Sequence, residues 1–286
     1  MIMKIAIAVD STCDLSPEII EENHIKIVPL YVNLGEKSLK DGIEIVPSDI
    51  FEFVKETGEL PKTSAVPIGE FLDVFEEFKK DADAIIYFSI SSGFSSSYQN
   101  AVVAAQEMEN VYVVDTKNLS TGEGLLVLKA CKMVKDGASV EEIVREMNVL
   151  SEKVDASFVI ENLDFLHKGG RCNALAHLGA NLLGIKPCIE VLNGKMSLGK
   201  KYRGKFASIL EKYVADKLTN VEVDDEFAFF TYSESDPDYV KAGIEAVKKL
   251  GKFKNLYITK AGCTITTHCG GNTMGVLFIR KDKKEM

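Results

Sequence analysis

Short apolar segments alternate with segments of helical periodicity along this chain, and this alternation limits its fold more than any other feature. In the first half, the strand-like segments are 4–9, 25–32, 84–90 and 111–114. Helical patterns begin near Ser16, Ser48, Gly69, Tyr98, Gly122 and Ser139. Ser16-Pro17-Glu18 and the pair Ser139 and Glu142 are typical helix starts. Strands that alternate with helices predict a mainly parallel sheet covered on both faces.

The alternation restarts at Ala156, which predicts a second α/β domain. Its strand-like segments are 157–160, 189–192, 227–231, 256–259 and 275–279, with a helix at 236–250 and a solvated acidic loop at 220–226. A chain of 286 residues is long enough for two modest domains with a ligand between them. We therefore expect two α/β domains, 1–154 and 155–286, each a mainly parallel sheet flanked by helices, with a ligand site at their interface.

The charge balance and the hydropathy pattern exclude several classes of protein. Lys and Arg number 34 against 43 Asp and Glu, and the formal charge of -9 argues against a nucleic-acid partner. No apolar run approaches the roughly 18 to 20 residues that span a bilayer, so we expect a cytoplasmic protein without a transmembrane segment. The six scattered cysteines are expected to be reduced thiols. Cys263, His268 and Cys269 lack the spacing of a recognised zinc site, so no metal is expected.

The serine-rich turn 91–97 lies between a strand-like run and a helical pattern. Backbone N–H groups and the positive end of a helix dipole are exposed at such a turn, which makes it a candidate anion site. Ser96 and Gln99 form a capping-box pair, which leaves the hydroxyl of Ser95 available for a ligand. The alternative is that these serines only cap and turn the chain. A hydrolase nucleophile elbow is not expected, because the second glycine of its motif is missing.

Other polar segments also lie where strands end or helices begin. Asp10-Ser11-Thr12 follows the first strand, and Thr63 to Pro67 is expected to be a rigid polar loop before a helix. Gly169 and Gly170 directly precede Arg171, whose guanidinium group can bind a carboxylate or phosphate through two hydrogen bonds. His268 lies in a segment, 266–273, that reads as a glycine-rich loop, where it can carry a proton near neutral pH. Ordinary turns, a basic surface loop and a packed histidine are the alternatives.

Taken together, these motifs resemble the DegV family. The segments that carry the resemblance are Asp10 to Leu15, Asp41-Gly42, Thr63 to Pro67, Ser91 to Ser95 with Tyr98-Gln99, Asp115-Thr116, Leu163 to Arg171, Lys186-Pro187 and His268-x-Gly270. Each motif is weak alone, whereas their order and spacing over nearly the whole chain are specific. Members of the FakB type hold a fatty acid and present its carboxyl group to a partner kinase that makes an acyl phosphate.

The resemblance implies roles for individual residues. Thr63 and Ser95 match the positions that bind the carboxylate, while Arg171 and His268 match positions that handle the head group or engage the kinase. Neighbouring residues of the same loops are expected to support them: Ser64, Ser92, Gly93, Gly169 and Gly170. The implied partners are a long-chain fatty acid and a fatty-acid kinase, with transient membrane contact but no cofactor, and the tail is expected in the amino-terminal domain.

The chain departs from the family pattern at two places. Ser96 and Ser97 replace a glycine and a threonine, and Gly271 and Asn272 replace a proline and a glycine. We expect these changes to affect chain-length preference and kinase coupling more than lipid binding. The expected function is binding without catalysis. The rivals are a phosphoryl- or acyl-transfer enzyme that uses the same polar cleft and, more weakly, a structural or regulatory module without a small ligand.

Overall fold

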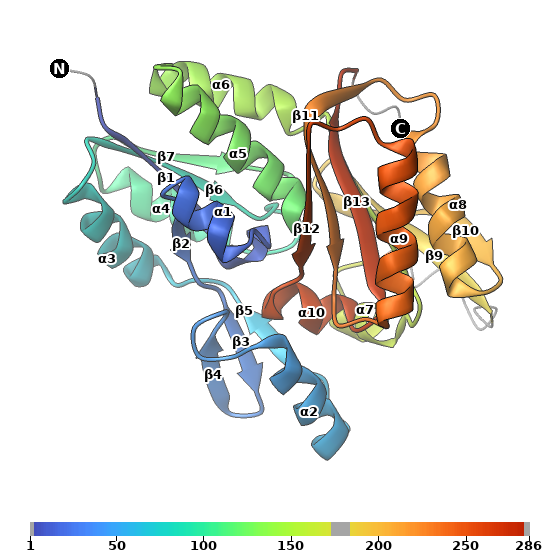
Figure 1. Cartoon of the computed structure of the whole chain (residues 1–286). Coiled ribbons are helices and arrows are strands. Elements are labelled where there is room, and N and C mark those ends of the chain that lie inside the picture. The colour runs from blue at the N-terminus through green and yellow to red at the C-terminus, as the bar shows by residue number, and fades with distance from the viewer. Residues whose placement is uncertain (1–2, 173–183, 283–286) are drawn as a thin grey trace.

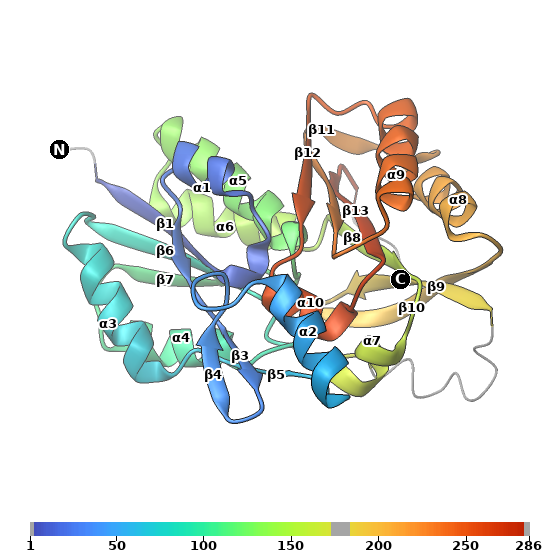
Figure 2. The same cartoon turned by 60° about the horizontal axis from the view of Figure 1, so that its bottom comes forward.

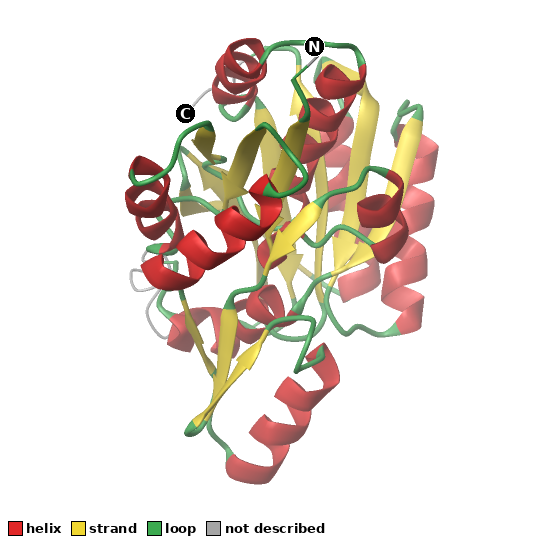
Figure 3. Ribbon diagram, turned by 90° about the vertical axis from the view of Figure 1, so that its left-hand side faces the viewer, coloured by secondary structure: helices red, strands yellow, loops and turns green. Residues whose placement is uncertain are grey.

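The structure is a computed structural model that describes residues 3–172 and 184–282. Two main sheets, one from each half of the chain, lie on either side of helix α5 (Thr121–Lys135) (Figure 1). A third, three-stranded sheet and helix α2 (Pro47–Thr57) project at one end of the molecule (Figure 3).

The amino-terminal sheet is parallel throughout, as the sequence predicts. Its strand order is β2-β1-β6-β7, with β1 at Ile5–Asp10, β2 at Lys26–Val28, β6 at Ala84–Ser89 and β7 at Val111–Asp115. The associated helices are α1 (Pro17–Glu22), α3 (Ile68–Lys79), α4 (Ser97–Gln106), α5 and α6 (Val140–Leu150), with a 3-10 turn η1 at Ser11–Cys13. Helices α3 and α4 pack on the face that carries Tyr87, and α5 packs on the face that carries Phe88. Because both faces are covered, every residue of β6 is buried.

The small sheet arises where the expected strand 25–32 divides in two. Pro29 lacks a backbone N–H and interrupts the pairing, so β2 ends at Val28 and β3 starts anew at Tyr31–Leu34. Strand β3 pairs antiparallel with β4 (Lys37–Lys40) and β5 (Lys62–Ser64). The expected polar loop at Thr63 is therefore a short strand. Thr63 in this strand pairs with Val32, whose buried neighbours cannot be predicted from the local sequence around Thr63.

The carboxyl-terminal sheet corrects the prediction of a second mainly parallel sheet. Its order is β10-β9-β8-β13-β11-β12, and only β11 and β12 run parallel. The strands are β8 (Val154–Ile160), β9 (Ile185–Leu192), β10 (Lys195–Arg203), β11 (Val223–Tyr232), β12 (Asn255–Lys260) and β13 (Thr273–Arg280). Asn193 and Gly194 both have positive φ, 49° and 75°, as a tight hairpin turn requires, so β10 folds back on β9. Strand β13 then enters between β8 and β11, antiparallel to both.

Helices cover one face of this second sheet, and α5 covers the other. Among its described residues, the second half contains helices α7 (Asp164–Gly169), α8 (Phe206–Leu218), α9 (Pro237–Leu250) and α10 (Cys263–Cys269). Helices α8 and α9 lie on the outer face (Figure 2). On the inner face, Phe158 and Leu277 share one hydrophobic cluster with Phe88 and Leu125 of the first half. The two halves therefore share a core, and α5 is buried between them.

The acidic segment 220–226, expected to be a loop, is only partly one, since β11 begins at Val223. Lys129 on α5 forms ion pairs with Asp224 and Glu226 at 2.7 and 2.6 Å.

All six cysteines are buried thiols, as predicted. The boundary between residues 154 and 155 stays a prediction. Within the described ranges, no helix combines the length and apolar character that crossing a membrane requires.

Candidate functional site

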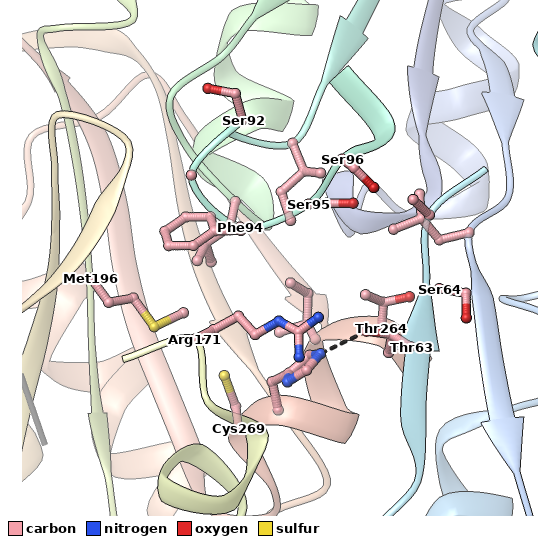
Figure 4. A pocket seen from close by; sticks show the side chains of 17 residues that line it. Thr63, Ser64, Ser92, Phe94, Ser95, Ser96, Arg171, Met196, Thr264 and Cys269 are labelled. Atoms are coloured by element: carbon pink, nitrogen blue, oxygen red, sulfur yellow. Dashed lines mark hydrogen bonds between the residues drawn. The ribbon is translucent and has the colours of Figure 1, made fainter. Parts of the chain in front are cut away.

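A pocket of about 370 Å³ lies where the loops after the amino-terminal strands meet α10 (Figure 4). Its hydroxyl, cationic and imidazole groups come from Thr63, Ser64, Ser92, Ser95, Ser96, Thr264, Arg171 and His268. Its apolar groups come from Leu30, Ala65, Ile90, Phe94, Leu119, Met196 and Ile265, and Gly93 and Cys269 complete the lining. All four residues expected to contact the head group thus line one pocket, together with three of the five expected supporting residues.

A hydrogen bond joins the two halves of the chain inside this pocket. Thr63 Oγ1 on β5 lies 2.8 Å from His268 Nε2 on α10. Thr63 is half-buried, and His268 is 9% exposed. A hydroxyl both donates and accepts, so this pair holds together with either tautomer of the neutral ring.

His268 is neutral at physiological pH. Burial and, to a smaller extent, the nearby Arg171 cation together lower the pKa of its imidazole from 6.5 to about 4, against the opposing effect of a Gly169 backbone contact. The proton-carrier role near neutral pH that the sequence suggests therefore does not fit the ligand-free site. A neutral ring instead offers one donor and one acceptor to a ligand.

This lowered pKa predicts that His268 reduces stability in acid. Between pH 6.5 and 4 the unfolded chain binds a proton that the folded chain does not, so stability present above pH 6.5 is lost as the pH falls through the folded pKa. We expect the wild type to lose about 3 kcal/mol more than His268→Gln between pH 7 and 4. Urea unfolding at each pH measures this difference, and parallel pH curves would contradict it.

The serine turn is built differently from the capping box that the sequence predicts. Helix α4 begins at Ser97, and Ser96 makes no side-chain cap because its backbone is already helical, with φ −77° and ψ 0°. Ser95 Oγ accepts a hydrogen bond from the Ser97 backbone N–H at 3.1 Å and lies 3.1 Å from Ser97 Oγ. Ser95 Oγ is the donor in this second contact, and rotation of its hydroxyl can redirect the hydrogen from Ser97 to a ligand.

Two neighbours of Ser95 connect the turn to other elements. Ser92 Oγ donates to Asp115 Oδ2 at 2.6 Å, and Figure 4 shows its hydroxyl directed away from Ser95. Ser91 Oγ donates to the carbonyl of Gly194 in the β9–β10 hairpin at 2.7 Å. A Cβ on Gly93 would come within 2.3 Å of that same carbonyl oxygen, so only glycine fits there. The turn therefore packs directly on the second sheet.

Arg171 follows the end of α7. Lys168 and Gly169 belong to the last turn of this helix, and Gly170 ends it with φ 69°. Arg171 Nη1 donates to the Gly169 carbonyl at 3.0 Å, and its guanidinium group is directed into the pocket (Figure 4). Gly169 and Gly170 do not line the pocket themselves. A Cβ on Gly169 would lie 2.7 Å from His268 Nδ1, so this glycine allows α7 and α10 to approach.

Most of the apolar wall of the pocket and one of its hydroxyl groups were not predicted from the sequence. Met196 lies on β10, which was not predicted, and Ile265 lies on α10, whose second half was read as a glycine-rich loop. That expectation is wrong for 266–269, because amide groups of α10 are capped by side chains more than 200 residues away. The hydroxyl of Thr264 lines the pocket, is buried, and has no hydrogen-bond partner among the described residues. The apolar residues Ile90 and Phe94, which stand beside the serines in the sequence, were the available signal for an apolar pocket wall.

Comparison with known proteins identifies the family. The sequence model of the DegV family matches residues 4–281. The chain belongs to the DegV family. A DegV domain-containing protein of Clostridium acetobutylicum is 36% identical to this DegV chain, over 97% of it and 99% of the relative. A solved structure of a fatty-acid-binding DegV family protein from Thermus thermophilus has a TM-score of 0.88 and 30% identity, covering 97% of this chain and 100% of that one. Bacillus subtilis DegV, solved as a fatty acid binding protein, has a TM-score of 0.82 and 30% identity, covering 98% and 100%.

The DegV pocket combines two chemical environments. Hydroxyl groups, a guanidinium group and a neutral imidazole gather around Thr63, while apolar side chains form the rest of the wall. In the described ranges, no group of three or more histidine, cysteine or acidic side chains is placed to hold a metal ion. The arrangement can bind an amphiphilic molecule through an anionic head and an apolar body.

Proposed function

We propose that this chain binds a long-chain fatty acid, with the carboxylate hydrogen-bonded to Thr63 and Ser95 in the pocket that Arg171 and His268 also line. The observation that carries the proposal is the presence of these four side chains and of seven apolar side chains in the wall of one pocket. The fatty-acid binding of the Thermus and Bacillus relatives supports it. The phosphoryl- or acyl-transfer rival would require a pocket walled by polar groups throughout, so the apolar wall favours the carrier.

The two ends of the ligand contribute differently to binding. Each buried methylene of the tail contributes about 0.8 kcal/mol. A hydrogen bond to a charged carboxylate contributes about 1.5–3 kcal/mol. Because the tail contains many methylenes, it supplies most of the affinity, and the head-group residues set the orientation.

We place the tail between the two halves of the chain rather than in the amino-terminal domain alone. A second cavity of about 30 Å³ adjoins the pocket and shares Leu119, Ile265 and Cys269 with it. Its remaining lining comes almost entirely from the second sheet, including Phe158 and Leu277. An apolar tail directed past Ile265 would therefore contact both sheets.

Native mass spectrometry of protein purified from cells is expected to show an added fatty-acid mass, and a ligand-free spectrum would contradict the proposal. We further expect Ser95→Ala to weaken the binding of oleate about ten- to hundredfold, because the carboxylate loses a hydrogen bond. Ser208→Ala is the matched control, since this exposed serine lies on α8 and does not line the pocket. Equal affinities for the two variants would remove Ser95 from the site.

We also propose that Arg171 and His268 serve a later step, in which a separate kinase phosphorylates the exposed carboxyl group. Arg171 is exposed at the pocket mouth, where its permanent charge can stabilise a phosphoryl group.

Arg171→Ala is expected to retain bound oleate but to form acyl phosphate at least tenfold more slowly with the kinase. The amount of bound oleate is made equal for the wild type and the variant before the rate is measured. Arg145→Ala, an exposed arginine on α6, controls for loss of charge alone. A normal rate of acyl-phosphate formation in Arg171→Ala would contradict this role.

A further inference from the structure

Two acidic side chains from motifs outside the pocket lie against the first turn of α10. The Gly262 backbone N–H donates to Asp14 Oδ1 at 2.7 Å. The N–H groups of Cys263 and Thr264 donate to Asp41 Oδ1 and Oδ2 at 2.9 and 3.0 Å. Asp14 is 6% exposed and Asp41 is 3% exposed. Both belong to the first 41 residues, whereas α10 lies near the other end of the chain.

These carboxylates supply a cap that α10 does not have in its own sequence. The first N–H groups of a helix have no partner inside the helix, and the cap residue Gly262 has no side chain to accept from them. Asp41 is itself held in place, because Ser11 Oγ donates to its Oδ2 at 3.1 Å and its own N–H donates to the Leu30 carbonyl at 2.9 Å. Three backbone N–H groups at the start of α10 thus donate to side chains of the amino-terminal half and hold the helix there.

Residues of the same helix also line the pocket, both in its first turn and one turn further on. Thr264, whose N–H is held by Asp41, and His268 are four residues apart and so lie on the same helix face. Both line the pocket, and His268 contacts Thr63 at 2.8 Å. Any rotation or shift of α10 at its first turn would therefore move both groups relative to Thr63.

We propose that Asp41, supported by Asp14, is a positioning residue for the head-group site: by capping α10 it fixes where His268 and Thr264 meet the ligand. The effect on ligand retention rests on the proposed function. The effect on His268 does not, since it follows from the packing of the protein alone. This assigns a role to the Asp41-Gly42 motif and to Asp14, which the head-group site left without one.

Asp41→Asn is the decisive variant. An asparagine offers one carbonyl oxygen in place of two carboxylate oxygens, so one of the two amide groups loses its partner. Burial is the largest cause of the lowered pKa of His268, so a displaced α10 that exposes the ring to water is expected to raise this pKa by at least one unit. NMR titration of ring-labelled histidines measures the shift, with the signal assigned by His268→Gln. Dissociation of labelled oleate is expected to accelerate at least tenfold. Asp236→Asn is the matched control, because Asp236 caps α9 through the Asp238 N–H at 2.9 Å and α9 carries no residue of this pocket.

An unchanged His268 pKa in folded Asp41→Asn would overturn the proposal. Should that variant fail to fold, Ser11→Ala removes the hydroxyl that donates to Asp41 and accepts from the Leu30 N–H, and it is expected to raise the His268 pKa by a smaller amount. No change in Ser11→Ala would then overturn the proposal. If the wild type retains no oleate, the proposed function fails, while the His268 comparison still decides the role of Asp41.

Discussion

Replacement of Asp10 by alanine is expected to lower the free energy of unfolding by about 2–6 kcal/mol, because two buried amide groups lose their acceptor at about 1–3 kcal/mol each. Asp10 is fully buried, and its carboxylate accepts from the N–H groups of Thr12 and Ile90 at 2.9 and 2.7 Å. Burial raises the pKa of Asp10 to about 6, so removing the charge offsets part of the loss. Ile90 leads into the serine turn, and the variant is therefore also expected to loosen that turn.

Urea unfolding followed by circular dichroism measures this effect. Asp49→Ala is the matched control, since the Asp49 carboxylate accepts from the exposed Val46 N–H at the start of α2. Loss of such an exposed cap costs about 1 kcal/mol. Asp10→Asn should fall between the two because it keeps one acceptor oxygen. Equal stabilities for Asp10→Ala and Asp49→Ala would show that the buried carboxylate is not needed.

Gly93→Val is expected to destabilise the protein by about 1–3 kcal/mol and to lower oleate affinity at least tenfold. The first carbon of any side chain at Gly93 would lie 2.3 Å from the Gly194 carbonyl oxygen, which belongs to the backbone and cannot rotate away. The serine turn or the β9–β10 hairpin must then move, and the Ser91 bond to Gly194 breaks. Ser95 and Met196, which line the pocket from these two segments, would separate.

Thermal unfolding and oleate titration test this prediction together. Gly69→Ala provides the contrast, because a Cβ at Gly69, in the first turn of α3, meets nothing within 4 Å. Alanine there is expected to leave binding unchanged and to raise stability by up to about 1 kcal/mol. Wild-type affinity in Gly93→Val would mean that the contact between turn and hairpin does not shape the pocket.

Local sequence signals were sufficient for the amino-terminal parallel sheet, whereas the pocket residues were predicted from the resemblance to the DegV family. The helix starts at Ser16 and Ser139 are confirmed, since each side chain caps its helix, and Ser139 forms the full capping box with Glu142. Apolar runs between helices correctly predict a parallel sheet. Thr63, Ser95, Arg171 and His268 do line one pocket: Thr63 lies on β5, Ser95 precedes α4, Arg171 follows α7 and His268 lies on α10.

Long-range partners explain what the sequence could not predict. Helix α10 depends on Asp14 and Asp41, and nothing near Cys263 signals them. The cap expected from Ser96 fails because its neighbour Ser95 bonds Ser97 instead. The antiparallel order of the second sheet depends on a hairpin turn at Asn193-Gly194 and on the insertion of β13, neither of which periodicity reveals.

The position of β13 has a consequence for the protein during its synthesis. This strand, Thr273–Arg280, is the last strand of the described residues, yet it lies inside the second sheet between β8 and β11. The amino-terminal sheet is complete once β7 has left the ribosome, whereas β8 has no partner on its β13 side until residues 273–280 have emerged. A nascent chain that has not yet exposed these residues therefore cannot assemble the second sheet, which carries one wall of the pocket.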